Sequence, residues 1–149
     1  MATNAVSTLN DLIEVSRDGE QGFRKAAEDT KNAELKALFS SRAAACAAAV
    51  TELQGQVTRL GGSPAEKGTV AGALHRGWVD LKTAVSSRDD HAVLSECERG
   101  EDVAKKHYRE ALDKDLPADV RALVERQYEG VIANHDRVKA LRDQYAPAQ

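Results

Sequence analysis

The sequence predicts an all-α protein built as a single domain over residues 1–149. Three observations favour this class. The chain is rich in alanine and contains only 4% aromatic residues, a composition that suits close-packed helices better than strands. Apolar residues recur at steps of three and four through several long segments, which is the helical period. Finally, two short segments of the chain resemble each other in a way that indicates two helix pairs.

The apolar pattern divides the chain into four long helices and one short helix. We predict the long helices at 7–29, 33–60, 90–114 and 117–145, and the short helix at 70–85. Asn32 is an N-cap residue for the second long helix, with Glu34 in its first turn, where the helix dipole favours negative charge. Gly61 and Gly62 end that helix, and Pro117 fits the first turn of the last one.

The internal repeat indicates how the helices are connected. Residues 32–39 match residues 117–124 in pattern, and each segment opens the second helix of a pair. Two antiparallel pairs joined by a long crossover form a ferritin-like four-helix bundle, which we prefer to an up-down bundle with an added helix. The short helix then lies in the crossover, and we expect Leu74, Trp78 and Leu81 to pack onto the bundle.

Three polar side chains interrupt the apolar faces of three different helices. They are Glu20, Glu101 and His135, each near the middle of its helix. Burying an unpaired carboxylate is costly, so we expect these side chains to meet in one polar pocket. The pocket holds either a hydrogen-bonded network, which could include Arg42, or a bound metal ion.

A metal site of the ferritin-like kind uses a Glu from each of two helices and a Glu-x-x-His pair from each of the others. The candidate metal ligands in this sequence are Glu20, Glu52, Glu98, Glu101 and His135. Gly55 and Ile132 stand where the histidines of the two pairs would be, so the ligand set is partial. Iron or manganese would be the cofactor.

Four motifs carry a resemblance to a known family. They are LNDLI at 9–13, DGEQGF at 18–23, ALHRGW at 73–78 and ECERGED at 96–102. With these motifs the chain resembles an uncharacterised bacterial four-helix-bundle family of unknown function, placed in the ferritin-like superfamily. The resemblance implies a ferritin-like fold and implies no reaction. More distantly, the chain is similar to rubrerythrin-like di-iron proteins, whose carboxylate positions correspond to Glu20, Glu52, Glu98 and Glu101.

The composition and charge of the chain limit the kinds of partner that it is expected to bind. The net charge of −3 and the pI near 5.8 argue against nucleic-acid binding, and no basic or long apolar stretch indicates a membrane. The N-terminal residues do not have the pattern of a signal peptide, so we expect a cytoplasmic protein. Cys46 and Cys97 are expected to be buried free thiols rather than a disulfide. A homodimer is compatible with an amphipathic bundle of this size.

Two functional classes therefore stay open. The first is a non-catalytic bundle with an inward Glu/His cluster, acting as a structural, stress-related or partner-binding protein. The second is a di-metal carboxylate protein that binds iron or manganese, with oxidoreductase-like activity.

Overall fold

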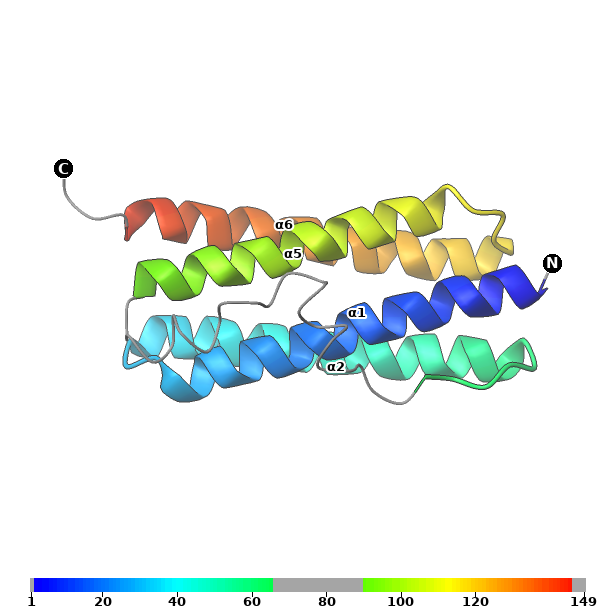
Figure 1. Ribbon diagram of the computed structural model, residues 1–149, viewed down its shortest axis with the longest axis horizontal. Helices are drawn as coiled ribbons and strands as arrows, with labels where there is room; N and C mark the ends of the chain where they lie inside the picture. The colour runs from blue at the N-terminus through cyan, green and yellow to red at the C-terminus, as the bar shows by residue number, and fades with distance from the viewer. Residues whose placement is uncertain (1, 66–89, 146–149) are drawn as a thin grey trace.

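A computed structural model describes residues 2–65 and 90–145 of the chain, and all regular structure in these two ranges is helical (Figure 1). The helices are α1 (Ala2–Asp29), α2 (Ala33–Arg59), α5 (Asp90–Leu112) and α6 (Ala118–Gln144). The prediction of an all-α protein is confirmed. The short helix predicted at 70–85, with Trp78, lies outside the described residues.

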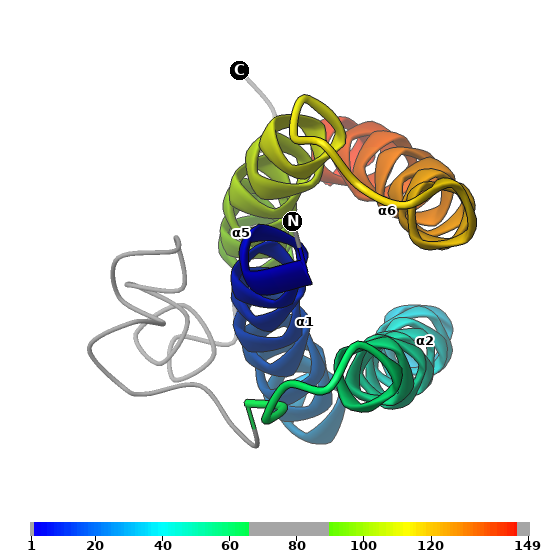
Figure 2. The same ribbon diagram turned by 90° about the vertical axis from the view of Figure 1, so that its right-hand side faces the viewer.

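The four helices pack in two pairs. α1 packs along α2, α5 packs along α6, and contacts between α1 and α5 join the pairs, whereas α2 and α6 contact each other only sparsely. Viewed along the bundle, the helices follow one another in the order α2, α1, α5, α6, and the outer two face each other with few backbone contacts between them (Figure 2). α2 ends at one end of the bundle and α5 begins at the other, so these two helices run parallel (Figure 1).

The ends of α2 follow from the residues that the sequence places there. Asn32 is the N-cap, and its Oδ1 accepts hydrogen bonds from the backbone N–H groups of Glu34 and Leu35 at 2.9 and 3.1 Å. At the other end, Gly61 has φ of +83°, a left-handed conformation that glycine adopts without strain. A Cβ on Gly62 would lie 2.6 Å from Cγ1 of Val6, so this position also needs glycine for close packing.

Two helix starts differ from the prediction. α1 begins at Ala2 rather than near Ser7, because the extra turn buries Ala5, which is 1% exposed. Pro117 is the N-cap of α6 rather than a residue of its first turn, since its ψ of 150° is extended and Ala118 is the first helical residue.

The buried apolar residues of the helices recur at the steps of three and four that the sequence predicted. On α2 the buried positions include Val50, Leu53 and Val57, which recur at steps of three and four. On α6 Gln127 is buried and Tyr128 only half-buried. The prediction of free, buried thiols at both cysteines is confirmed.

The apolar core falls into two clusters, one toward each end of the bundle. On α5, for example, one cluster contains Leu94 and Cys97 and the other contains Tyr108 and Ala111. The residues between them include Glu98 and Glu101, and a similar gap on α6 contains His135. The bundle therefore has a polar layer at mid-height, between two apolar layers.

Candidate functional site

The first group in the polar layer is an ion pair that crosses the bundle from α2 to α5. Nε of Arg42 donates to Oε1 of Glu101 at 2.9 Å, and Nδ2 of Asn134 on α6 donates to the same oxygen at 2.8 Å. The Glu101 side chain is 3% exposed. Within the described ranges its Oε2 has no hydrogen-bond partner. Burial raises the pKa of the Glu101 carboxyl, and the nearby Arg42 guanidinium offsets only part of that effect.

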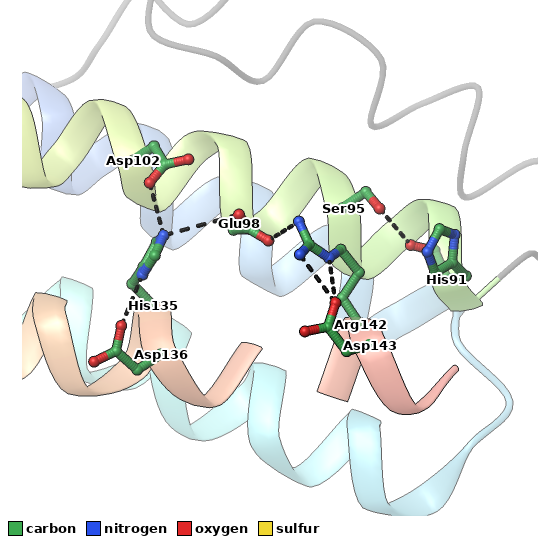
Figure 3. A network of polar contacts seen from close by, with 8 residues as sticks. All are labelled: His91, Ser95, Glu98, Asp102, His135, Asp136, Arg142 and Asp143. Atoms are coloured by element: carbon green, nitrogen blue, oxygen red, sulfur yellow. Dashed lines mark hydrogen bonds and ion pairs between the residues drawn. The ribbon is translucent and has the colours of Figure 1, made fainter. Parts of the chain in front are cut away.

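The second group brings His135 on α6 against two carboxylates on α5 (Figure 3). Nε2 of His135 lies 2.7 Å from Oδ1 of Asp102 and 4.0 Å from Oε1 of Glu98. Glu98 and Asp102 are four residues apart, so both project from the same side of their helix. One ligand atom from each of the three side chains lies within 4.8 Å of the other two.

The His135 ring is held from its other nitrogen. Nδ1 lies 3.0 Å from Oδ1 of Asp136, and an ionised carboxylate can only accept, so Nδ1 is the donor in this contact. The hydrogen bond from His135 lowers the pKa of the Asp136 carboxyl. Nε2 is buried and lies at ion-pair distance from Oδ1 of Asp102, but it forms no hydrogen bond in the described part of the chain.

The carboxylate of Glu98 has a different neighbour on each oxygen. Oε1 faces His135, whereas Oε2 forms an ion pair with Nη1 of Arg142 near the end of α6 (Figure 3). The Glu98 side chain is 13% exposed, so this carboxylate is largely shielded from water. Arg142 therefore fixes the direction in which Glu98 presents its second oxygen.

The other two predicted ligands have arginine partners elsewhere. Glu20 lies between Arg17 and Arg24 of its own helix, with N–O distances of 2.8 and 2.7 Å. Glu52 accepts from Arg126 at 2.7 Å, and this hydrogen bond lowers the pKa of its carboxyl. Of the five predicted residues, the structure brings Glu98 and His135 together. Glu101 binds Arg42 instead, and Glu20 and Glu52 belong to separate ion pairs.

A third polar group links all four helices through hydrogen bonds. The hydroxyl of Tyr108 on α5 lies 3.2 Å from Oγ of Ser16 on α1 and donates to Oε1 of Gln127 on α6 at 2.8 Å. Nε2 of Gln127 in turn donates to Oε1 of Glu52 on α2 at 3.1 Å. This chain satisfies the buried tyrosine and joins the two helix pairs.

The sequence pattern did not single out Asp102, Asp136 or Gln127. Asp102 is 55% exposed and Asp136 is 67% exposed, so neither interrupts an apolar stripe. The spacing of Glu98 and Asp102 at i and i+4 was a signal that could have identified the pair, because such residues share a helix face. The burial of Gln127 was not predicted, because its neighbour Tyr128 is the larger and more apolar of the two and is the residue expected to be buried.

These observations define an all-α protein whose described residues form four helices, with a Glu/Asp/His group between α5 and α6. The chain belongs to the family described as "Domain of unknown function (DUF2383)", whose model matches residues 4–114. That match covers α1, α2 and α5. Comparison with curated proteins gives no match. No helix in the described ranges combines the length and apolar character needed to cross a membrane.

Proposed function

We propose that this protein is a non-catalytic ferritin-like bundle that binds a single divalent transition-metal ion through Glu98, Asp102 and His135. One observation carries the proposal. The buried Nε2 of His135 lies 2.7 Å from Asp102 and 4.0 Å from Glu98, two carboxylates one helical turn apart, and it forms no hydrogen bond with either among the described residues. The ring nitrogen and the two carboxylates are held close together without a hydrogen bond between them, and a metal ion would bind all three groups.

The donor set suits such an ion. Imidazole nitrogen and carboxylate oxygen together are ligands for zinc, iron and manganese. Ligand atoms bound to one ion at about 2.1 Å lie about 3 Å from one another. The separations of 2.7 and 4.0 Å from Nε2 to the two carboxylates are close to that spacing, so small side-chain movements would suffice.

The surroundings of the three side chains support the same function. Metal-binding histidines usually donate their second ring N–H to a carboxylate, which orients the ring and raises its basicity. Asp136 stands in that position at 3.0 Å from Nδ1. Arg142 holds one oxygen of Glu98 and leaves the other directed toward His135.

A single ion is favoured over a di-metal centre by the partners of the other carboxylates. Glu20, Glu52 and Glu101 each form ion pairs with arginine at 2.7 to 2.9 Å. Those arginines would have to be displaced before the carboxylates could bind a second cation, leaving charged groups without partners. The proposed function is therefore metal binding, without the redox chemistry of a paired-metal site.

The test is a metal titration of chelator-treated protein by isothermal titration calorimetry. Zn²⁺ and Mn²⁺ are used in air and Fe²⁺ without oxygen. We expect one ion per chain, and we expect His135→Gln and Asp102→Asn to weaken binding strongly. His107→Gln is the matched control, because His107 also pairs with an aspartate, Asp11, at 2.7 Å but lies outside this group.

Two results would contradict the proposal. If no ion binds, the bundle has a structural or partner-binding role instead. If two ions bind per chain and Glu20→Gln or Glu52→Gln removes one of them, the di-metal function is the better account.

A further inference from the structure

A second feature of the bundle is a cavity of about 240 Å³ on the side where α2 and α6 stand apart. Buried residues of α1 and α5 line its floor, and residues of α2 and α6 line its walls. Ala45 and Ala48 on α2 and Gly130 on α6 are exposed residues at its rim, so the cavity opens to solvent between these helices. Glu98, Asp102 and His135 are not among its lining residues.

Small residues on all four helices create this space. Gly19 on α1, Ala49 on α2, Gly100 and Ala104 on α5 and Gly130 on α6 all line it. A bundle core is normally filled by larger aliphatic side chains at native packing density. A cavity that opens to water and is bounded by several helices is the usual form of a small-molecule site.

The polar group best placed to recognise a ligand is Arg42. Its Nε donates a hydrogen bond to Glu101. Its two Nη amino groups form no hydrogen bond within residues 2–65 and 90–145. The side chain is only 14% exposed, and Nη1 lies 4.0 Å from where a Cβ on Gly130 would be. Arg42 therefore reaches across the cavity from α2 toward α6 with unused donors.

The chemistry of the site favours an organic anion with one charge. A guanidinium with unused Nη groups binds a carboxylate through parallel N–H···O bonds. Val15, Phe23 and Val131 provide apolar wall for the rest of a ligand. Glu52 and Glu101 also line the cavity, so its two arginines are already matched by two carboxylates, and the lining has no net positive charge to favour a doubly charged phosphate.

We propose that this cavity binds a small organic monocarboxylate, whose carboxylate contacts the Nη groups of Arg42 and whose apolar body lies against the surrounding walls. This function goes beyond metal binding and uses different residues. It requires no change in the Arg42–Glu101 contact, since Nε remains on Glu101 and only the free Nη donors are engaged.

The experiment titrates metal-free protein with benzoate, with hexanoate and with inorganic phosphate, and follows the backbone and Arg42 Nε signals by ¹H–¹⁵N NMR. We expect saturable shifts with at least one carboxylate, at Arg42 and at residues lining the cavity. We expect phosphate to produce no such shifts at the same concentration and ionic strength.

Two variants locate the binding site. Gly130→Met fills the rim opposite Arg42 and leaves the Arg42–Glu101 ion pair in place, and it should weaken carboxylate binding at least about tenfold. Gly55→Met is the matched control, because a Cβ at Gly55 meets nothing within 4 Å and this residue does not line the cavity. The control should bind as the unaltered protein does. Arg42→Lys keeps the charge but removes the paired donors, so it should also weaken binding about tenfold or more.

Circular dichroism melting confirms that each variant is folded before its affinity is compared. The proposal is overturned if neither carboxylate gives saturable shifts, if phosphate binds as tightly as the carboxylates, or if Gly130→Met binds with unchanged affinity. None of these outcomes depends on metal binding at His135, so the two proposals are tested separately.

Discussion

At the scale of single residues, the molecule contains charged groups that are buried and mostly paired. The sequence identified Glu101 and His135, because each interrupts an apolar stripe. It did not identify Asn134 or Asp102, because a polar residue on a polar face looks the same whether it contacts water or a neighbouring helix. Which buried charges share a partner depends on how far each helix is rotated and shifted, and a single sequence does not contain that information.

The Arg42–Glu101 pair leads to a prediction about stability. Glu101→Leu removes the partner of a largely buried guanidinium and should cost about 3 kcal/mol or more of unfolding free energy. Glu101→Gln keeps an oxygen that can accept from Arg42 and Asn134, so it should cost clearly less. Urea unfolding at pH 7 measures both, and equal losses in the two variants would contradict the assigned hydrogen bonds.

Cys46 leads to a prediction about pH. Burial raises the pKa of its thiol to about 12 from an ordinary value of 9.0. The unfolded chain therefore releases this proton at lower pH than the folded protein does, and the resulting contribution to stability is lost as pH rises from about 9 to about 12. We expect the unfolding free energy to fall more steeply above pH 9 in the unaltered protein than in Cys46→Ala. Identical slopes would show that the thiol is not shielded.

Asp136 leads to a prediction about metal affinity. Its carboxylate is exposed and contacts the far side of the His135 ring, so Asp136→Ala should leave the fold intact. It should nevertheless weaken metal binding by roughly 10- to 100-fold, the usual effect of removing such an orienting partner. Isothermal titration calorimetry measures the change in metal affinity. Asp143→Ala is the comparison, because Asp143 is also an exposed aspartate but contacts Arg142.

At the scale of helices, the sequence was most informative where a residue has one clear structural use. Asn32 and the Gly61–Gly62 pair lie at the ends of α2 as predicted, because capping and a left-handed turn are local properties. The start of α1 was placed too late, since Ala5 is buried by contacts with other helices that a local pattern does not include. Local chemistry therefore predicts helix ends better than it predicts which face is buried.

The side chain of Asn32 at the start of α2 makes two different contacts, and mutation can distinguish their contributions to stability. Asn32 caps the helix through Oδ1, and its Nδ2 donates to the hydroxyl of Tyr145 at 2.7 Å. Asn32→Asp keeps the cap and loses the donor, whereas Asn32→Ala loses both. We expect the alanine variant to lose about 1 kcal/mol more than the aspartate variant, as measured by thermal or urea unfolding. Equal stability of the two variants would argue against the cap.

At the scale of the whole molecule, the sequence predicted four long helices packed in pairs and could not predict the open side between α2 and α6. The cavity arises from the spacing of helices that contact each other little, and that spacing depends on the packing of the other pairs. The small residues along it are visible in the sequence, and an alanine-rich run such as Ala43–Ala49 is usually a sign of a closely packed helix face. In the fold, several of those alanines border open space instead.

α6 lies beyond the region matched by the family, yet the structure makes it integral to the core. Val120, Val124 and Val138 are each 0% exposed, and Gln127 completes the hydrogen-bond chain to Tyr108. We therefore expect a chain truncated after Leu116 to lose cooperative thermal unfolding. A truncated chain that melts cooperatively at an unchanged temperature would show that α6 is dispensable.

The pairwise packing of the helices also has a consequence for how the chain reaches this fold. α1 and α2 are joined by residues 30–32, α5 and α6 by residues 113–117, and most interhelical contacts lie within these two hairpins. Contacts between neighbouring segments require only short loops to close, so their entropic cost is small and they form quickly. We therefore expect each hairpin to form before α1 docks on α5, since that docking joins segments farther apart in the chain.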